Sequence, residues 1–195
     1  MSGPSPRAPL SLEASARRIG HYCWIEMRAF EILGTWTAQV PEPAVKATLA
    51  THSRQHGWHA ELWHDLLPAI GESGVDSFIE PASAALVAFV EALAAPGAPE
   101  LTLEKLVGAY RVHVPHTVSA YRQHLDGTSP ISDGPTIRAL RLVLSDQLDH
   151  WREGEALLQA QLRSDADVDR ASSHQLHLEK LLVASGGIAG AGPSS

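Results

Sequence analysis

The sequence contains a single cysteine, Cys23, among its 195 residues. One thiol cannot close an intramolecular disulfide, so a disulfide scaffold is excluded and a reducing compartment is favoured. Uninterrupted apolar runs of about 18 residues are also missing, and residues 1–10 lack the apolar segment of a signal peptide. We therefore expect a cytoplasmic protein without a membrane span.

Clusters of basic residues are absent as well. The chain has 15 Lys and Arg against 22 Asp and Glu, a formal net charge of -7. Proteins that bind nucleic acids or anionic membranes present basic patches, so we expect neither partner. Alternating strand patterns and repeats of fixed period are missing too, which leaves helices as the expected regular structure.

Apolar residues recur with a period near 3.6, which predicts helices over residues 11–40, 44–67, 82–95, 102–125 and 136–162. Pro41 and Pro43 leave only a short link between the first two, which makes them an antiparallel hairpin. Residues 68–81 form a long crossover, and Pro115 should kink the fourth helix. We expect disorder over 1–10, one helical bundle over 11–163, and a loosely attached segment over 164–195 with a short amphipathic helix (174–184) and a flexible Gly-rich tail.

The second helix carries the most informative pattern. Its core-facing positions are Val45, Leu49, His52, His56, His59, Trp63 and Leu66. Three consecutive positions of this stripe are histidine, where Leu, Ile or Val is usual. Buried imidazoles must find hydrogen-bond partners or hold a metal, so the pattern predicts a polar site inside the bundle.

The other long helices also carry polar residues near the middle of their core-facing stripes. These residues are Glu26 on the first, Tyr110 and His113 on the helix over 102–125, and Gln147 and His150 on the helix over 136–162. Residues three apart lie on one face of a helix, so these groups can meet at one level. Two helical hairpins joined by a long crossover, with these residues inside, resemble the ferritin-like (di-iron carboxylate) superfamily over residues 11–162.

The resemblance implies an all-α, ferritin-like four-helix bundle whose long crossover contains a short helix, and a homodimer. In that superfamily two helices supply a Glu and two supply Glu-x-x-His to a metal pair. Glu26, His59 and His150 match those ligand positions. His56 and Gln147 stand where the family has glutamate, and the third long helix has no carboxylate at its middle.

These replacements remove charge that two divalent ions need, although Asp146 can supply a second carboxylate. The altered pattern therefore implies one divalent transition metal, Fe, Zn, Cu or Ni. Its candidate ligands are Glu26, His56, His59, Asp146 and His150, and the groups beside it are Tyr110, His113 and Gln147. We expect Glu26, His59 and His150 to converge as a facial triad, the arrangement of iron oxygenases, which would make the protein an oxidoreductase.

Two alternatives remain open at this point. The bundle can hold no metal, its polar residues bonding one another, and serve as a scaffold for a small-molecule ligand or a protein partner. It can also keep a true two-metal centre. The sequence alone does not decide among these, nor whether the protein is an enzyme.

Overall fold

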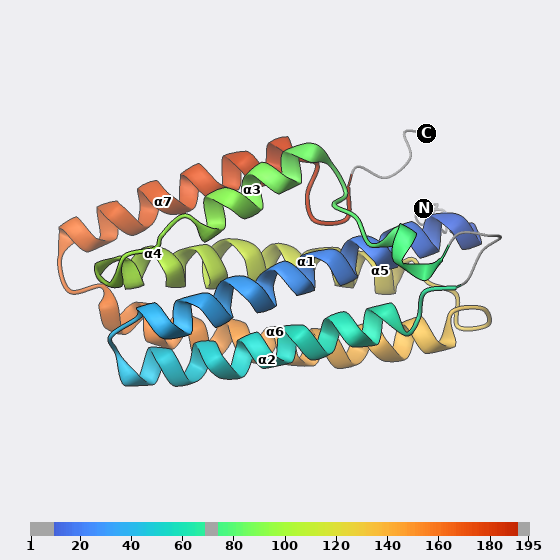
Figure 1. Cartoon of the computed structure of the whole chain (residues 1–195), viewed down its shortest axis with the longest axis horizontal. Coiled ribbons are helices and arrows are strands. Elements are labelled where there is room, and N and C mark those ends of the chain that lie inside the picture. Colours follow the sequence, from blue (N-terminus) through green and yellow to red (C-terminus); the bar gives the residue numbers. More distant parts are fainter. Residues whose placement is uncertain (1–9, 69–73, 191–195) are drawn as a thin grey trace, which may run out of the picture.

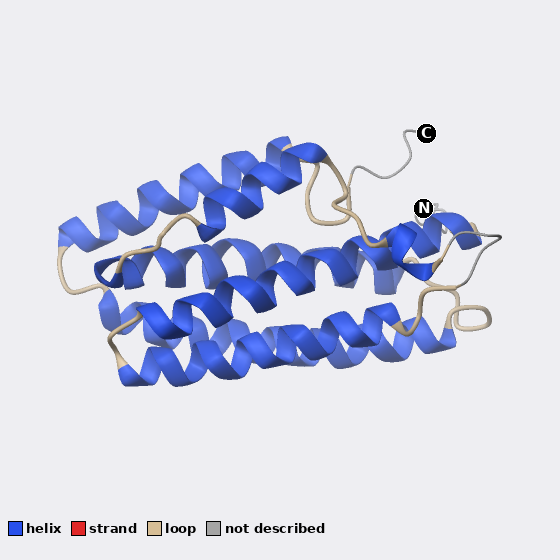
Figure 2. Ribbon diagram, in the orientation of Figure 1, coloured by secondary structure: helices blue, strands red, loops and turns tan. Residues whose placement is uncertain are grey.

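The computed structural model describes residues 10–68 and 74–190, and every regular element within these two ranges is a helix (Figures 1 and 2). The α-helices are α1 (Leu12–Gln39), α2 (Pro43–His64), α3 (Ala84–Ala94), α4 (Thr102–Val107), α5 (Val114–Asp126), α6 (Gly134–Gln161) and α7 (Asp165–Ala184). A π-helix, η3 (Gly108–His113), joins α4 to α5, and short 3-10 turns lie at η1 (Val75–Phe78) and η2 (Pro99–Leu101). The all-α prediction is confirmed. Disorder was predicted for residues 1–10, and residues 1–9 lie outside the described ranges.

The first two helices form the predicted antiparallel hairpin, and they share the most extensive contact between any two elements. Ser11 caps α1, because its hydroxyl accepts a hydrogen bond from the Ala14 N–H at 3.2 Å. Pro43 then opens α2, where its missing N–H would have had no partner in any case. Both helix starts therefore follow from local sequence.

The helical run Thr102–Asp126 contains Pro115, where we predicted a kink, and the structure has a π turn directly before this proline. The six residues Gly108–His113 adopt the wider π turn, and the Val114 N–H donates to the Ala109 carbonyl. Pro115 has no N–H and its ring crowds the carbonyl four residues back, so a widened turn beside it relieves the crowding. This turn carries Tyr110 and His113, two of the predicted site residues.

The C-terminal helix differs from the prediction. It was expected to be short, over 174–184, but α7 begins at Asp165 and buries Ala171, Leu178 and Leu182. Ser164 caps it through the Asp167 N–H at 3.3 Å, and acidic residues in its first turn favour the helix dipole. It lies beside α3 and contacts α4 (Figure 1), so this segment is packed against the bundle instead of loosely attached. Of the Gly-rich tail, Ile188 is buried, and residues 191–195 lie outside the described ranges.

The buried apolar side chains form two clusters, and the polar residues lie between them. One cluster includes Leu49 on α2 and Leu158 on α6, and the other includes Trp63 on α2 and Leu140 on α6. The histidines of α2 and the polar pair of α6 fall between these positions in the sequence. Along each helix, an apolar end thus gives way to a polar middle layer.

No single described helix is both long and apolar enough to cross a bilayer. Ala84–Ala94 and Pro99–Asp126 are long and apolar enough only when they are taken together, and a bend of 115° separates them.

Candidate metal centre

The histidine stripe of α2 faces the interior as predicted. His52, His56 and His59 are all buried, the most exposed of them at 1%. They continue the face on which Val45 and Leu49 pack into the core. The spacing of the stripe was therefore a correct guide to burial, because a helix that buries one side buries every position at that spacing.

Glu26 of α1 lies at the centre of the polar layer and is fully buried. Its Oε1 accepts hydrogen bonds from the Tyr121 hydroxyl at 2.5 Å and from Gln147 Nε2 at 3.1 Å. Its Oε2 faces two imidazoles, with His56 Nδ1 at 2.5 Å and His59 Nδ1 at 3.5 Å. One oxygen is thus fixed by neutral donors, and the other is left to the histidines.

This arrangement brings together a set of ligand atoms suited to a metal ion. Glu26, His56 and His59 each offer one ligand atom, and these atoms lie within 4.8 Å of one another. His59 Nδ1 is buried and makes no hydrogen bond, so a ligand atom is free at the centre of the group. Two imidazole nitrogens and one carboxylate oxygen form a donor set that divalent transition metals prefer.

Asp146 lies on the far side of the His59 ring from Glu26. Its Oδ2 is 3.0 Å from His59 Nε2, and its side chain is 23% exposed. A carboxylate in this position fixes the tautomer of a histidine whose other nitrogen binds metal. The predicted ligand Asp146 is therefore placed to orient His59, not to contact the same ion as Glu26.

We expect Asp146→Ala to weaken metal binding by about 10–100-fold, the usual effect of removing such an orienting group. Calorimetric titration of the metal-free protein with Zn(II) measures this loss. The matched control is Asp149→Ala on the same helix, whose side chain is 58% exposed and pairs with Arg152 outside the site. Equal affinities for the Asp146 and Asp149 variants would show that the carboxylate at 146 does not support the site.

The contact between α2 and α6 is a ladder of three antiparallel polar pairs. His52 Nε2 lies 3.2 Å from Glu153 Oε2, His150 Nε2 lies 2.8 Å from Gln55 Oε1, and the third pair is His59 with Asp146. Each pair joins a buried imidazole to a side-chain oxygen on the facing helix. This register holds the α6 residues at fixed places beside the α2 histidines.

His150 is buried beside His56, with ring centroids 5.1 Å apart, but it lies outside the group of ligand atoms that Glu26, His56 and His59 form. Its ring stacks on His52 with centroids 4.0 Å apart, and lies 6.1 Å from the His59 ring. Its Nε2 faces Gln55, while its buried Nδ1 has no partner. The third member of the central group is His56, because the α2–α6 register directs His150 toward the neighbouring turn of α2.

The three residues predicted to lie beside the metal have different surroundings. Gln147 contacts Glu26 directly, as given above. The Tyr110 hydroxyl lies 2.8 Å from His52 Nδ1, and His52 is not a member of the Glu26, His56 and His59 group. His113 is buried with both ring nitrogens unpartnered, and its ring centroid is 5.7 Å from that of His56. Their roles as cofactor contacts stay predictions.

Tyr121 contacts Glu26 directly, although the sequence analysis did not single it out. The missed signal is chemical: a buried tyrosine usually needs a partner for its hydroxyl, and Glu26 provides it. Tyr121 also packs edge-on against Tyr22 with centroids 4.7 Å apart, which closes the layer on the side of the second apolar cluster.

The electrostatics keep Glu26 charged and most of the imidazoles neutral. Burial by itself would raise the pKa of Glu26, but His56 and His59 outweigh it and hold the pKa well below its usual value. Burial would likewise lower the pKa of His59, yet Asp146 and Glu26 raise it to about 9. Burial and the neighbouring His56 lower the pKa of His113 to about 3, and burial also lowers that of His150. Without metal, a proton on His59 therefore balances the Glu26 carboxylate.

These shifts predict a stability maximum near pH 6.5 for the metal-free protein. The pKa of His59 is raised to about 9, so its contribution is complete below an unfolded-state value of about 6.5 and is lost as the pH rises through 9. The pKa values of His52 and His113 are lowered to about 4 and about 3, so their contributions are present above pH 6.5 and are lost toward those values. Urea unfolding from pH 4 to 9.5 measures the profile. A free energy of unfolding that continues to rise to pH 9 would show that His59 is neutral in the folded protein.

Comparison with protein-family models, with curated proteins and with solved structures finds no match to this chain. The resemblance to ferritin-like proteins therefore depends on the residues and their arrangement alone. What the structure adds is an all-helical protein with a buried Glu26, His56 and His59 cluster.

Proposed function

We propose that this protein is a metalloprotein that binds one divalent transition ion through Glu26, His56 and His59. The observation that carries the proposal is the Glu26 Oε2 atom, buried and faced by Nδ1 of both histidines. Neutral imidazoles with one carboxylate suit Fe(II), Zn(II), Cu(II) or Ni(II) better than Mg(II) or Ca(II).

The charge around the site supports one ion and not two. Glu26 and Asp146 together bring two negative charges, which balance the two positive charges of a single divalent ion. The further carboxylate that contacts the layer, Glu153, is 60% exposed and pairs with His52, so a second ion would add two charges without a buried carboxylate to balance them, at a large cost in desolvation. His113 and His150 are neutral and can bind metal, but they cannot offset this charge.

The number of protein ligands favours a reactive role. Three protein ligands leave coordination positions for substrate, water or dioxygen, as in catalytic metal sites, whereas structural sites are closed by four. Glu26 is restrained at Oε1 by Tyr121 and Gln147, which leaves Oε2 as its single binding atom. We therefore propose an oxidoreductase or oxygenase as the class of activity, in a divergent ferritin-like bundle.

The ferritin-like part of the proposal is supported by topology. The α1–α2 hairpin is followed by a long crossover that contains α3, and then by the run Thr102–Asp126 and α6. Glu26 on α1 and His59 on α2 lie at the ligand positions of that family. His56 and Gln147 replace its carboxylates, which accounts for the change from two ions to one.

A second candidate function has support in the same hydrogen bonds. Glu26 has four polar neighbours and His59 Nε2 is paired with Asp146, so the groups around this carboxylate already bond one another without metal. The protein would then be a metal-free scaffold that binds a small molecule or a protein partner.

Metal content separates the two functions. Protein purified without added metal, and then loaded with each of the candidate ions in turn, should hold one tightly bound ion per chain by elemental analysis. At a hundredfold excess over Kd, binding should stabilise the fold by about 2.7 kcal/mol. For a domain of this size, this stabilisation raises the melting temperature by roughly 5–10 °C. The His56→Ala, His59→Ala double variant should lose this increment. A melting temperature of metal-free protein that no candidate ion changes would favour the scaffold.

A further inference from the structure

The outer face of the α1–α2 hairpin carries a groove of about 870 Å³. Its lining is largely apolar, and three large side chains in it, Met27, Phe30 and Trp58, are 37%, 47% and 44% exposed. Large apolar groups gathered on an open surface mark a binding site, because a molecule that covers them removes them from water.

The groove is long and narrow. Cys23 and Thr37, the outermost α1 residues that line it, are fourteen residues apart, which corresponds to about 21 Å along the helix axis. Spread over that length, the volume leaves a cross-section of about 40 Å², below that of a helix about 10–12 Å across. The groove therefore admits one row of side chains and not a whole helix. Such a row is what the apolar face of an amphipathic helix presents.

One wall of the groove is held in place before any partner binds. Gly57 of α2 lines the groove, and a Cβ at this position would approach the Phe30 ring to 3.2 Å. The ring therefore packs directly on the α2 backbone at this point. A wall that is already fixed loses little freedom on binding, which favours affinity.

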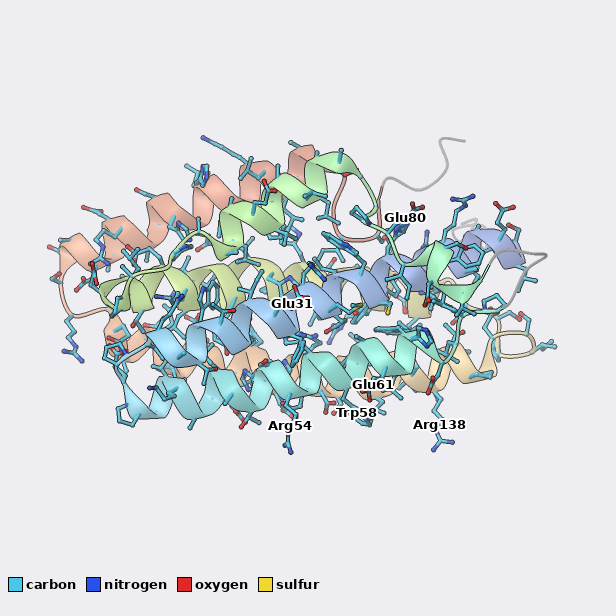
Figure 3. The ribbon with its side chains drawn as sticks, viewed as in Figure 1. Glu31, Arg54, Trp58, Glu61, Glu80 and Arg138 are labelled. Atoms are coloured by element: carbon cyan, nitrogen blue, oxygen red, sulfur yellow. The ribbon has the colours of Figure 1, made fainter. Side chains whose placement is uncertain are left out.

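The charges along the groove are concentrated at one end. Arg54, Trp58 and Glu61 lie along one edge of α2 (Figure 3). Beyond Glu61, toward η1, the groove is lined by Asp65 and Asp76, and all three carboxylates are exposed. Arg54 is the only Lys or Arg among the described residues of the lining. The half of the groove near η1 is therefore negative.

Little on the chain itself offsets this charge. Asp76 and Asp65 face one imidazole, that of His64, at 3.3 and 3.9 Å, and Glu61 forms no ion pair within the described ranges. α2 ends at His64, so the partial negative charge of its C-terminus adds to that of the carboxylates. A positive group on a partner would be attracted to this end.

We propose that this groove binds an amphipathic helix of a partner protein, with its apolar face in the groove and with Lys or Arg at the end that lies near η1. Contact with Phe30 and Trp58 supplies the affinity, and the carboxylates set the direction in which the helix lies. The proposal goes beyond the metal centre and does not depend on it, because the residues of that centre are buried in the interior of the bundle.

Synthetic peptides test the proposal on the metal-free, full-length chain. The probe is a labelled helical peptide of about fourteen residues, with leucine along one face and lysine at one end. Fluorescence anisotropy should give a dissociation constant of about 10 µM. A peptide with glutamate in place of lysine should bind at least about tenfold more weakly, because it places like charges together. A peptide of the same composition with the leucines scattered around the helix should also lose at least about tenfold.

Variants of the chain locate the binding site. Glu61→Lys should weaken binding of the lysine peptide by about tenfold, and Glu91→Lys, an equal change at an exposed position of α3, should leave it unchanged. Trp58→Ala should also weaken binding by at least about tenfold, with an unchanged circular dichroism spectrum, because the side chain is 44% exposed.

Four outcomes would overturn the proposal. Equal binding of the lysine and glutamate peptides would show that the carboxylates do not select the partner. Binding that Trp58→Ala leaves unchanged would place the peptide outside the groove. Absence of binding at about 1 mM peptide would leave the groove to a ligand of another class. A wild-type chain that dimerises in sedimentation equilibrium, with the dimer lost in Trp58→Ala, would show that a second copy occupies the groove.

Discussion

Replacing Glu26 with glutamine is expected to remove tight metal binding, with a loss of affinity of at least a hundredfold. The amide keeps the size of the side chain but has no charge, so a divalent ion would be left in a buried layer without its central anion. The pKa of His59, raised to about 9, depends partly on Glu26, so the metal-free variant also loses a buried charge pair. We expect its free energy of unfolding to fall by about 3 kcal/mol.

Two measurements check this prediction. Titration with Co(II) or Zn(II) gives the affinity, and urea unfolding of the metal-free variant gives the stability. The control is Glu153→Gln, whose side chain is 60% exposed and touches only the outer nitrogen of His52. It removes the same charge without contact with the central group and should bind metal as the wild type does. Wild-type affinity in the Glu26 variant would show that this carboxylate is not a ligand.

Gly154→Ala should be one of the two most destabilising additions of a methyl group at a described glycine, the other being Gly20→Ala, whose Cβ would meet the Phe78 backbone carbonyl. A Cβ at Gly154 would lie 2.0 Å from the Tyr110 ring. The ring cannot move aside easily, because it is fully buried and its hydroxyl is held by His52 at 2.8 Å. Overpacking commonly costs 1–3 kcal/mol, and a clash with a fixed ring should reach about 3 kcal/mol or more.

Denaturant unfolding of a small set of variants tests this close approach. Gly134→Ala at the start of the same helix is the control, because nothing lies within 4 Å of the added atom, and it should change the stability by less than about 0.5 kcal/mol. Tyr110→Ala leaves a cavity and is itself destabilising, but it removes the group that clashes. Gly154→Ala should therefore cost much less in the Tyr110→Ala background than in the wild type. Additive effects of the two substitutions would contradict the contact.

Gly154 and Tyr110 also matter to the site, because their contact sets the surroundings of the polar layer in the middle of the bundle. Tyr110 reaches His52 only because α6 has no side chain at Gly154, and His52 in turn stacks on His150. The π turn that carries Tyr110 also places His113 beside His56. The packing of α6 against η3 therefore sets the surroundings of the α2 histidines.

Helix positions and burial followed from local patterns in the sequence. Ser11, Pro43 and the apolar period of each segment act within a few residues, so the starts of α1 and α2 and the burial of the His52, His56 and His59 stripe could be predicted. Where a local signal was overlooked, the prediction failed: Ser164 with Asp165 and Asp167 marks the true start of α7. The same reasoning identified Glu26 as a polar group on a buried face.

Which buried groups meet across helices was decided only by the tertiary structure. The spacings of α2 and α6 allowed either His56 or His150 to complete the group around Glu26, because a periodic pattern says which side of a helix is buried but not its register against a neighbour. That register depends on many weak contacts at once, including the Gln55–His150 and Asp146–His59 pairs and the gap at Gly154. The sequence by itself determined a helical protein with a buried histidine stripe and one central carboxylate. The packing of α1 on α2 decided that His56 and His59 face Glu26, and the packing of α6 on α2 placed Asp146 behind His59.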